Sequence, residues 1–216
     1  MTRNRFKKLD LIKIYESLYK EYGPQHWWPG DTPWEVCVGA VLTQNTSWTN
    51  VEMAISNLQK LNSICPVKIR NMPLAKLENA IHPSGFYRLK ARRLLAVTDW
   101  WLANVENDKL HPPGKSLAFW RESILSVKGV GPETADSILL YSFNLPTFVI
   151  DAYTRRIMSR HFGSNPDIAY HELQKYFMDN LPSDPQLFNE FHALFVRMAK
   201  EHCRKSGCRE GCPLKK

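Results

Sequence analysis

The chain has 216 residues, enough to bury a core of its own, and its composition of 44% hydrophobic and 23% charged residues excludes a mainly disordered protein. No window approaches the roughly 18 consecutive apolar residues that a membrane-spanning helix needs. Lys and Arg number 29 against 21 Asp and Glu, a net charge of +8, which favours a polyanionic partner: nucleic acid first and an acidic membrane surface second.

We do not expect the N-terminal segment to act as a secretory signal. Residues 1–8 are basic, but Asp10 and Lys13 interrupt the next segment with charges, so the apolar stretch of a signal peptide does not form. We therefore expect a cytoplasmic protein.

Apolar residues recur at helical spacing along nearly the whole chain. Thr32 and Pro33 are typical of a helix start, and the segment after them is apolar on all sides, which predicts a central buried helix. The predicted helices cover residues 9–22, 34–43, 48–61, 73–81, 88–105, 116–126, 134–142, 152–160, 170–178 and 185–202. The run Phe148-Val149-Ile150 is too short to found a sheet, so the predicted fold class is all-α.

Two glycines flank a valine in Gly129-Val130-Gly131, directly before a predicted helix. Glycine permits backbone conformations closed to other residues and lets the chain approach another surface closely. The N-terminus of that helix offers unpaired amides and a positive dipole, which suits a phosphate. The pattern alone leaves two interpretations open: a phosphate-binding turn, or a helix–helix turn whose glycines serve only its geometry.

A single acid, Asp151, ends the apolar run 148–150 and begins the next predicted helix. Aspartate is favoured as the residue that caps a helix N-terminus, so capping alone would explain it. A functional carboxylate is the second interpretation.

Four motifs in this order make the chain similar to a known family. They are residues 39–46 (Gly-Ala-Val-Leu-Thr-Gln-Asn-Thr), residues 83–91 (Pro-Ser-Gly-Phe-Tyr-Arg-Leu-Lys-Ala), the pattern Leu-x-x-x-Gly-Val-Gly-x-x-Thr-Ala-Asp at 125–136, and Val-Ile-Asp at 149–151. The sequence resembles, over essentially its whole length, the helix-hairpin-helix (HhH-GPD) DNA glycosylases of the endonuclease III superfamily. Trp27-Trp28-Pro29, 43–46 and 84–87 are most similar to the endonuclease III-like 3-methyladenine DNA glycosylases.

The resemblance implies two helical lobes with the active-site cleft between them. Residues 30–146 would form a six-helix lobe that contains the hairpin. Residues 1–29 and 147–216 would form the second helical lobe from both termini, with a cysteine-containing C-terminal tail.

The resemblance also implies roles for individual residues. Asp151 would be the catalytic carboxylate. Gln44 and Asn45 would lie where the family inserts residues into the gap left by an extruded base. The DNA backbone would be bound by Lys128, Gly129, Val130 and Gly131 of the hairpin, together with Arg88 and Lys90. Phe86 and Tyr87 are predicted to pack in the core or within their loop.

The expected reaction is hydrolysis of the N-glycosidic bond of an alkylated purine after base flipping. A carboxylate stabilises the positive charge that develops on the sugar, and one acid suffices when the leaving base is already cationic. This chemistry needs no cofactor. Bifunctional relatives carry a lysine two residues after the final hairpin glycine, where this chain has Glu133; an acid cannot form an imine, so we expect a monofunctional enzyme without lyase activity.

The aromatic residues near the N-terminus are candidates for the base pocket. Trp27, Trp28 and Pro29, together with Trp48, would line it, because stacking a cationic purine on an indole gains cation–π attraction. The alternative is that adjacent tryptophans in a Pro-bounded loop fill a gap, and at least one of the pair is expected to do only that.

Three cysteines, Cys203, Cys208 and Cys212, crowd the C-terminal tail. In a cytosolic chain such a trio indicates metal ligation before disulfides. Relatives with a [4Fe–4S] cluster use four cysteines in a different spacing, so the ligand set here is incomplete. Three alternatives stay open: a cluster with a non-cysteine fourth ligand, a zinc ion with His202 nearby, or no metal.

The expected partner is double-stranded DNA that contains a damaged base, bound by a monomer with no membrane contact and therefore nucleoid-associated. Two other functions remain open. One is a bifunctional endonuclease III-type glycosylase and AP lyase that uses another lysine, and the other is a non-catalytic DNA-binding module.

Overall fold

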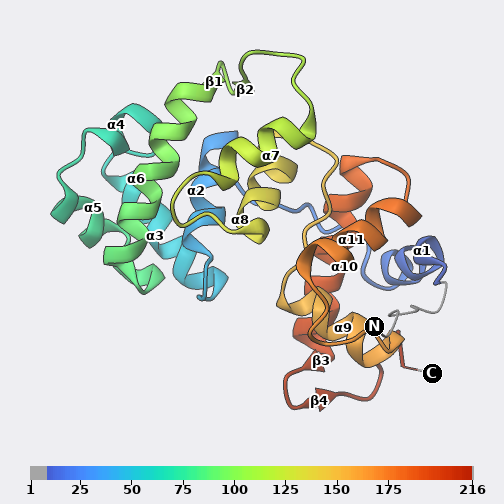
Figure 1. Cartoon of the computed structure of the whole chain (residues 1–216). Helices are drawn as coiled ribbons and strands as arrows, with labels where there is room; N and C mark the ends of the chain where they lie inside the picture. Colours follow the sequence, from blue (N-terminus) through green and yellow to red (C-terminus); the bar gives the residue numbers. More distant parts are fainter. Residues whose placement is uncertain (1–8, 216) are drawn as a thin grey trace. The chain divides into compact units, whose positions relative to one another are not determined.

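The computed structural model describes residues 9–215, so the basic segment 1–8 and Lys216 lie outside the described residues (Figure 1). Within that range the chain is helical, with two small antiparallel hairpins, which confirms the all-α prediction. The elements are α1 (Leu11–Tyr22), α2 (Pro33–Leu42), α3 (Trp48–Lys60), α4 (Pro66–Arg70), α5 (Leu74–Ala80), η1 (His82–Ser84), α6 (Tyr87–Asn104), β1 (Val105–Glu106), β2 (Lys109–Leu110), α7 (Leu117–Leu125), α8 (Pro132–Ser137), η2 (Ile138–Ser142), α9 (Ala152–Phe162), α10 (Tyr170–Asn180), α11 (Pro185–Glu201), β3 (Cys203–Arg204) and β4 (Gly207–Cys208).

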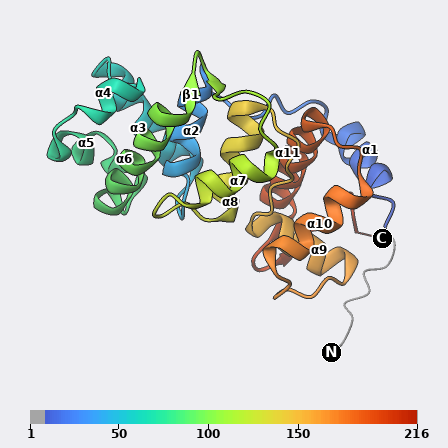
Figure 2. The same ribbon diagram turned by 45° about the horizontal axis from the view of Figure 1, so that its top comes forward.

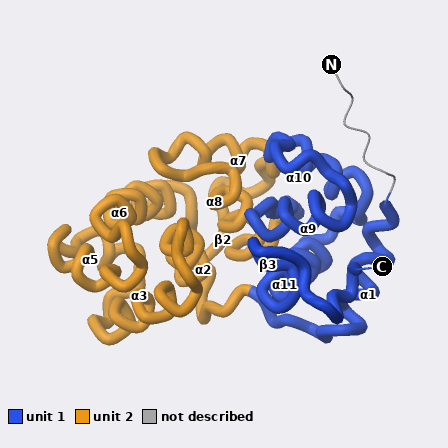
Figure 3. The backbone as a smooth tube through the Cα atoms, turned by 90° about the horizontal axis from the view of Figure 1, so that it is seen from below, with its two compact units in different colours: residues 1–27, 146–216 blue, residues 28–145 orange. Residues whose placement is uncertain are grey.

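The chain divides into two compact units (Figure 3). Unit 2 is residues 28–145, and the described part of unit 1 is residues 9–27 together with 146–215. The boundaries expected from the sequence lie after residues 29 and 146. In the described range no helix has both the length and the apolar composition that crossing a bilayer requires.

Unit 2 is built around α2, which packs against α3, α6, α8 and η2 (Figure 2). Thr32 caps this helix by accepting a hydrogen bond from the amide of Glu35, Pro33 begins it, and every residue from 34 to 42 is buried. Seven α-helices form this unit where six were predicted, because α4 has only five residues and is too short to show helical periodicity. The helix predicted at 134–142 divides into α8 and the π-helix η2.

Unit 1 has an aromatic core on the apolar face of α11. Phe148 stacks on Phe177 with ring centroids 4.2 Å apart, and Phe188 and Phe191 meet Phe148 edge to face. The apolar run 148–150 is a buried segment without regular secondary structure, and it belongs to no sheet.

Side chains of α10 satisfy the main chain of this segment. The amide of Gln174 donates to the carbonyl oxygen of Phe148 at 2.8 Å and to Oγ1 of Thr147 at 3.0 Å, and the hydroxyl of Tyr170 accepts from the amide of Ile150 at 3.3 Å. Buried backbone groups need such partners, so these contacts hold the segment that ends at Asp151.

Candidate active site

Asp151 is a buried acid with two polar partners. It caps α9, its Oδ1 accepts a hydrogen bond from the amide of Thr154 at 2.7 Å, and the side chain is nearly enclosed. Its Oδ2 lies 3.5 Å from Nε2 of His192, a buried residue of α11. Capping therefore uses one oxygen, and the other faces an imidazole.

Burial of Asp151 raises its pKa, but the charge of His192 and the hydrogen bonds from His192 and Thr154 outweigh it, so the pKa lies below its ordinary value of 3.8. The carboxyl is therefore an anion at neutral pH, held inside the protein. Sequence reasoning did not single out His192. The available signal was its position four residues after Phe188 and three before Phe195, on the apolar stripe of the helix.

The low pKa of Asp151 predicts that the folded protein loses stability as the pH falls through that pKa. A depressed folded-state pKa contributes stability that is present above the unfolded value and is lost as the pH falls through the folded value. In His192→Gln we expect the pKa of Asp151 to rise, because burial then prevails. Titration of its carboxyl ¹³C resonance measures this, with His171→Gln, an exposed histidine of α10, as the control. An Asp151 pKa that stays unchanged in His192→Gln would show that the pair does not set it.

The Gly129-Val130-Gly131 turn in unit 2 buries its centre and exposes its flanks. Val130 is 8% exposed, whereas Lys128, Gly129 and Gly131 face solvent. Gly129 has φ +92°, and a Cβ there would lie 2.6 Å from Cγ of Arg93, so both its conformation and its space require glycine. The turn thus exposes its main chain to solvent on either side of one anchoring side chain.

Two polar contacts hold this turn. Arg121 of α7 donates to both oxygens of the buried Asp136 in α8, at 2.8 and 3.0 Å, which ties together the helices on either side of the turn. The amide nitrogen of Gln44 donates to Oγ1 of Thr134 at 2.9 Å and to the carbonyl oxygen of Gly129 at 3.4 Å.

Gln44 and Asn45 have different surroundings. The carbonyl oxygen of Gln44 accepts a hydrogen bond from Arg93, so both ends of its amide are engaged within unit 2. Asn45 is exposed and has a left-handed backbone with φ +53°. Of the two predicted insertion residues, Asn45 therefore has the side chain that is available to another molecule.

The structure corrects the prediction that Lys90 contacts phosphate. Lys90 is 1% exposed, and its ammonium donates to the carbonyl oxygens of Leu42 at 2.8 Å and Ser84 at 2.7 Å. Desolvation lowers its pKa to about 8. This lysine lies on the inner face of α6 and binds main-chain carbonyls in the interior, so it holds the end of α2 against η1.

Phe86 and Arg88 lie on the surface. Phe86 is 69% exposed with φ +47°, so the prediction that it packs in the core or its loop is wrong. Arg88 is exposed, with its guanidinium 5.7 Å from the ring centroid of Tyr87. Because Lys90 binds the carbonyls of Leu42 and Ser84, the segments that carry Asn45 and Phe86 are held by one ammonium.

The predicted pocket residues Trp28 and Trp48 pack against each other. Their ring centroids are 5.1 Å apart at an interplanar angle of 89°, and Trp28 also lies 5.0 Å from Tyr141 of η2. Gly39 makes room for this indole, because a Cβ there would lie 3.0 Å from its Nε1. Trp27 is partly buried and Pro29 is exposed.

The cysteines do not converge as predicted. Cys208 and Cys212 meet His161 of α9, with their sulfurs 3.7 and 3.9 Å from its Nε2. Cys203 lies outside this group, with its sulfur 3.3 Å from Nη1 of Arg160, and His202 lies outside it too.

A [4Fe–4S] cluster held by cysteines needs four thiolates. Cys37 is fully buried in α2 of unit 2, Cys65 belongs to the same unit, and only two sulfurs meet in the tail. The described residues therefore do not assemble the ligand set of a four-cysteine cluster.

Comparisons with known proteins agree with this arrangement. Residues 38–183 match the model of the HhH-GPD superfamily of base excision DNA repair proteins. The chain is 45% identical over 216 residues, all of this chain and 97% of the other, to a Methanocaldococcus jannaschii protein named as a candidate DNA repair glycosylase. It is 28% identical to the endonuclease III of Sulfolobus acidocaldarius, over 77% of this chain and 72% of that one.

Among solved structures, the 3-methyladenine DNA glycosylase of H. pylori bound to 1,N6-ethenoadenine superposes with a TM-score of 0.73 at 28% identity, covering 89% of this chain and 98% of that one. An endonuclease III–DNA complex shares the fold, with a TM-score of 0.78 at 20% identity over 97% and 94% of the two chains. The chain belongs to the HhH-GPD superfamily of base excision DNA repair proteins and is one of its DNA glycosylases, acting on DNA with a damaged base by a chemistry that needs no cofactor.

Proposed function

We propose that the protein is a monofunctional glycosylase that hydrolyses the N-glycosidic bond of alkylated purines of the 3-methyladenine type, with Asp151 as the catalytic carboxylate. Its anion lies in a low-dielectric setting, where it stabilises positive charge on a sugar far better than it would in water. The oxygen that does not cap α9 is the one that would face the sugar or orient the attacking water.

The proposal that the enzyme has no lyase step rests on Glu133. It is exposed in the first turn of α8, two residues after Gly131, where bifunctional relatives place their lysine. A carboxylate has no amine with which to form an imine to the sugar, so the reaction ends after base release.

The proposed DNA contacts come from exposed groups of unit 2. The main chain at Gly129 and Gly131, with Lys128 beside it, would bind phosphate, and Arg88 adds a further cation. Asn45 and Phe86 would fill the space left by the flipped base, which offsets part of the few kcal/mol that unstacking costs. We propose that one protein molecule acts alone.

The alkylated-purine class is supported by the likeness to the H. pylori enzyme, whose structure holds 1,N6-ethenoadenine. It is also supported by the tryptophans near residue 28, because electron-rich indole faces attract a cationic base. Since Trp28 and Trp48 meet edge to face, one purine does not stack between these two rings as they are arranged.

The test is to incubate the protein with alkylated duplex DNA and to measure released bases and strand scission separately. We expect 3-methyladenine release without scission and without a borohydride-trapped protein–DNA adduct. In Glu133→Lys we expect trapping to appear, because an amine then stands at the lyase position. The matched control is Glu122→Lys, which makes the same charge change at an exposed site of α7.

Each outcome decides one part of the proposal. Trapping by the wild-type protein would show that another lysine forms the imine and that the enzyme is bifunctional. Release of no alkylated base, with intact binding to the duplex, would overturn the substrate class and leave a different lesion or a binding module.

A further inference from the structure

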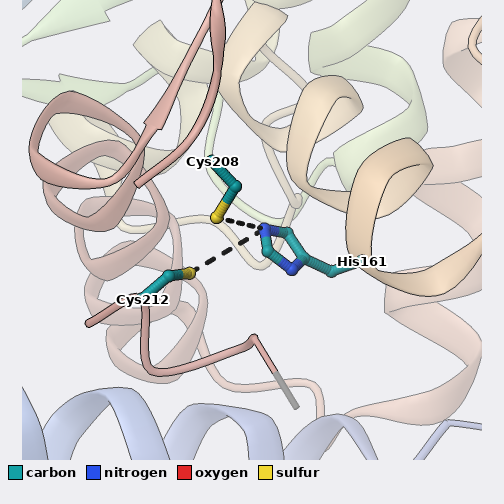
Figure 4. A group of neighbouring side chains, drawn as sticks. All are labelled: His161, Cys208 and Cys212. Carbon is teal, nitrogen blue, oxygen red and sulfur yellow. Dashed lines mark hydrogen bonds between the residues drawn. The ribbon is translucent and has the colours of Figure 1, made fainter. Parts of the chain in front are cut away.

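The C-terminal tail and α9 bring three potential metal ligands together. His161 lies in the last turn of α9, Cys208 in β4 and Cys212 four residues later (Figure 4). The two sulfurs and Nε2 of His161 all lie within 4.8 Å of one another, and Figure 4 shows the three side chains pointing toward a common centre.

The two sulfur–nitrogen separations are close to those of a tetrahedral zinc site. Zinc–sulfur bonds of about 2.3 Å and zinc–nitrogen bonds of about 2.0–2.1 Å place sulfur and nitrogen about 3.6 Å apart. The observed separations are 3.7 Å from Cys208 and 3.9 Å from Cys212. Both sulfur–nitrogen separations therefore lie within about 0.3 Å of the zinc-site value.

Hydrogen bonding alone does not explain why both thiols face one nitrogen. A neutral imidazole nitrogen either donates one proton or offers one lone pair, so Nε2 satisfies one of the two sulfurs at a time. A divalent cation satisfies all three atoms at once.

A main-chain group next to His161 is a partner of its imidazole ring. This group, the main chain of Leu214, is a hydrogen-bond partner of the imidazole. A carbonyl partner on the ring nitrogen that faces away from a metal keeps the lone pair on the nitrogen that faces it.

Two arginines of α9 fix the β3–β4 hairpin beside this histidine. Nε of Arg156 donates to the carbonyl oxygen of Cys203 at 2.7 Å, and Nη1 of Arg160 donates to that of Arg204 at 2.7 Å. The strand that carries Cys208 is therefore positioned by contacts independent of any ion.

We propose that His161, Cys208 and Cys212 bind one zinc ion, with a water molecule at the fourth position and with Cys203 taking no part. Two thiolates and an imidazole are ligands that zinc prefers, and the set lacks the four thiolates of an iron–sulfur cluster. The ion would fasten the tail to the end of the helix that Asp151 begins, so it stabilises the folded protein.

The test is metal analysis of the full chain, purified without chelator, equilibrated with zinc chloride and desalted. We expect about one zinc per chain in the wild type and in Cys203→Ser, and background levels in Cys208→Ser, Cys212→Ser and His161→Asn. Cys203→Ser is the matched control, because it removes a thiol from the same hairpin outside the proposed set.

Cobalt provides a second readout that needs no variant. Titration of the wild-type protein with cobalt chloride should produce visible bands of tetrahedral cobalt with sulfur charge transfer, and zinc should displace them. The absence of both metals from the wild type, iron with labile sulfide in their place, or loss of zinc in Cys203→Ser would each overturn the proposal. None of these results depends on base excision.

Discussion

Replacing Asp151 by Asn is expected to lower the single-turnover rate of base release by about 100- to 1,000-fold and to leave duplex affinity nearly unchanged. Asparagine caps a helix as well as aspartate and has nearly the same volume, so the substitution removes the charge and little else. The rate is measured on alkylated duplex with enzyme in excess, and affinity by fluorescence anisotropy.

The control for this variant is Asp184→Asn. Asp184 also caps a helix of unit 1, α11, where it accepts a hydrogen bond from the amide of Gln186 at 2.9 Å, but no imidazole is paired with it in the described structure. We expect wild-type excision from Asp184→Asn. If Asp151→Asn excises at the wild-type rate, Asp151 is a capping residue and the catalytic assignment is wrong.

Replacing Gly129 by Ala is expected to weaken binding to duplex DNA at least about tenfold, equivalent to about 1.4 kcal/mol. Alanine at φ +92° is strained, and its Cβ would collide with the side chain of Arg93, so either the turn or Arg93, with its hydrogen bond to Gln44, must shift. Affinity measured at several salt concentrations should also show a shallower salt dependence than the wild type, because fewer phosphates are neutralised.

Gly114→Ala separates this effect from backbone strain. Gly114 belongs to the same unit, has φ +79° and has open space where a Cβ would lie. Both variants carry the strain of about 1–2 kcal/mol that a left-handed alanine brings. Thermal unfolding of the two variants compares the resulting loss of stability. We expect Gly114→Ala to bind DNA as the wild type does. Equal affinity in both variants would show that the hairpin does not bind the backbone.

Local sequence signals determined most of the helices and the position of Asp151 at a helix start. Thr32 with Pro33 began α2, and the all-round apolar character of that segment indicated its burial. Asp151 was predicted to begin a helix and does so. These signals are short-range, because periodicity and capping involve residues within one or two helical turns. They can therefore be identified in the sequence without the tertiary structure.

The same signals were weaker where elements are short or irregular. The five residues of α4 are fewer than two helical turns, and the widened turn of η2 has no distinct pattern of its own. Phe86 is an apolar residue whose side chain was predicted to pack, and no local pattern indicated that a left-handed backbone would turn it outward.

The sequence by itself thus determined an all-α protein, its order of helices and the residues of its glycine hairpin. Only the tertiary structure decided which distant groups meet: His192 with Asp151, Lys90 with the carbonyl oxygen of Leu42, and His161 with Cys208 and Cys212. The partners in these pairs lie 41 to 51 residues apart, and each contact depends on how whole helices pack, which no local pattern encodes.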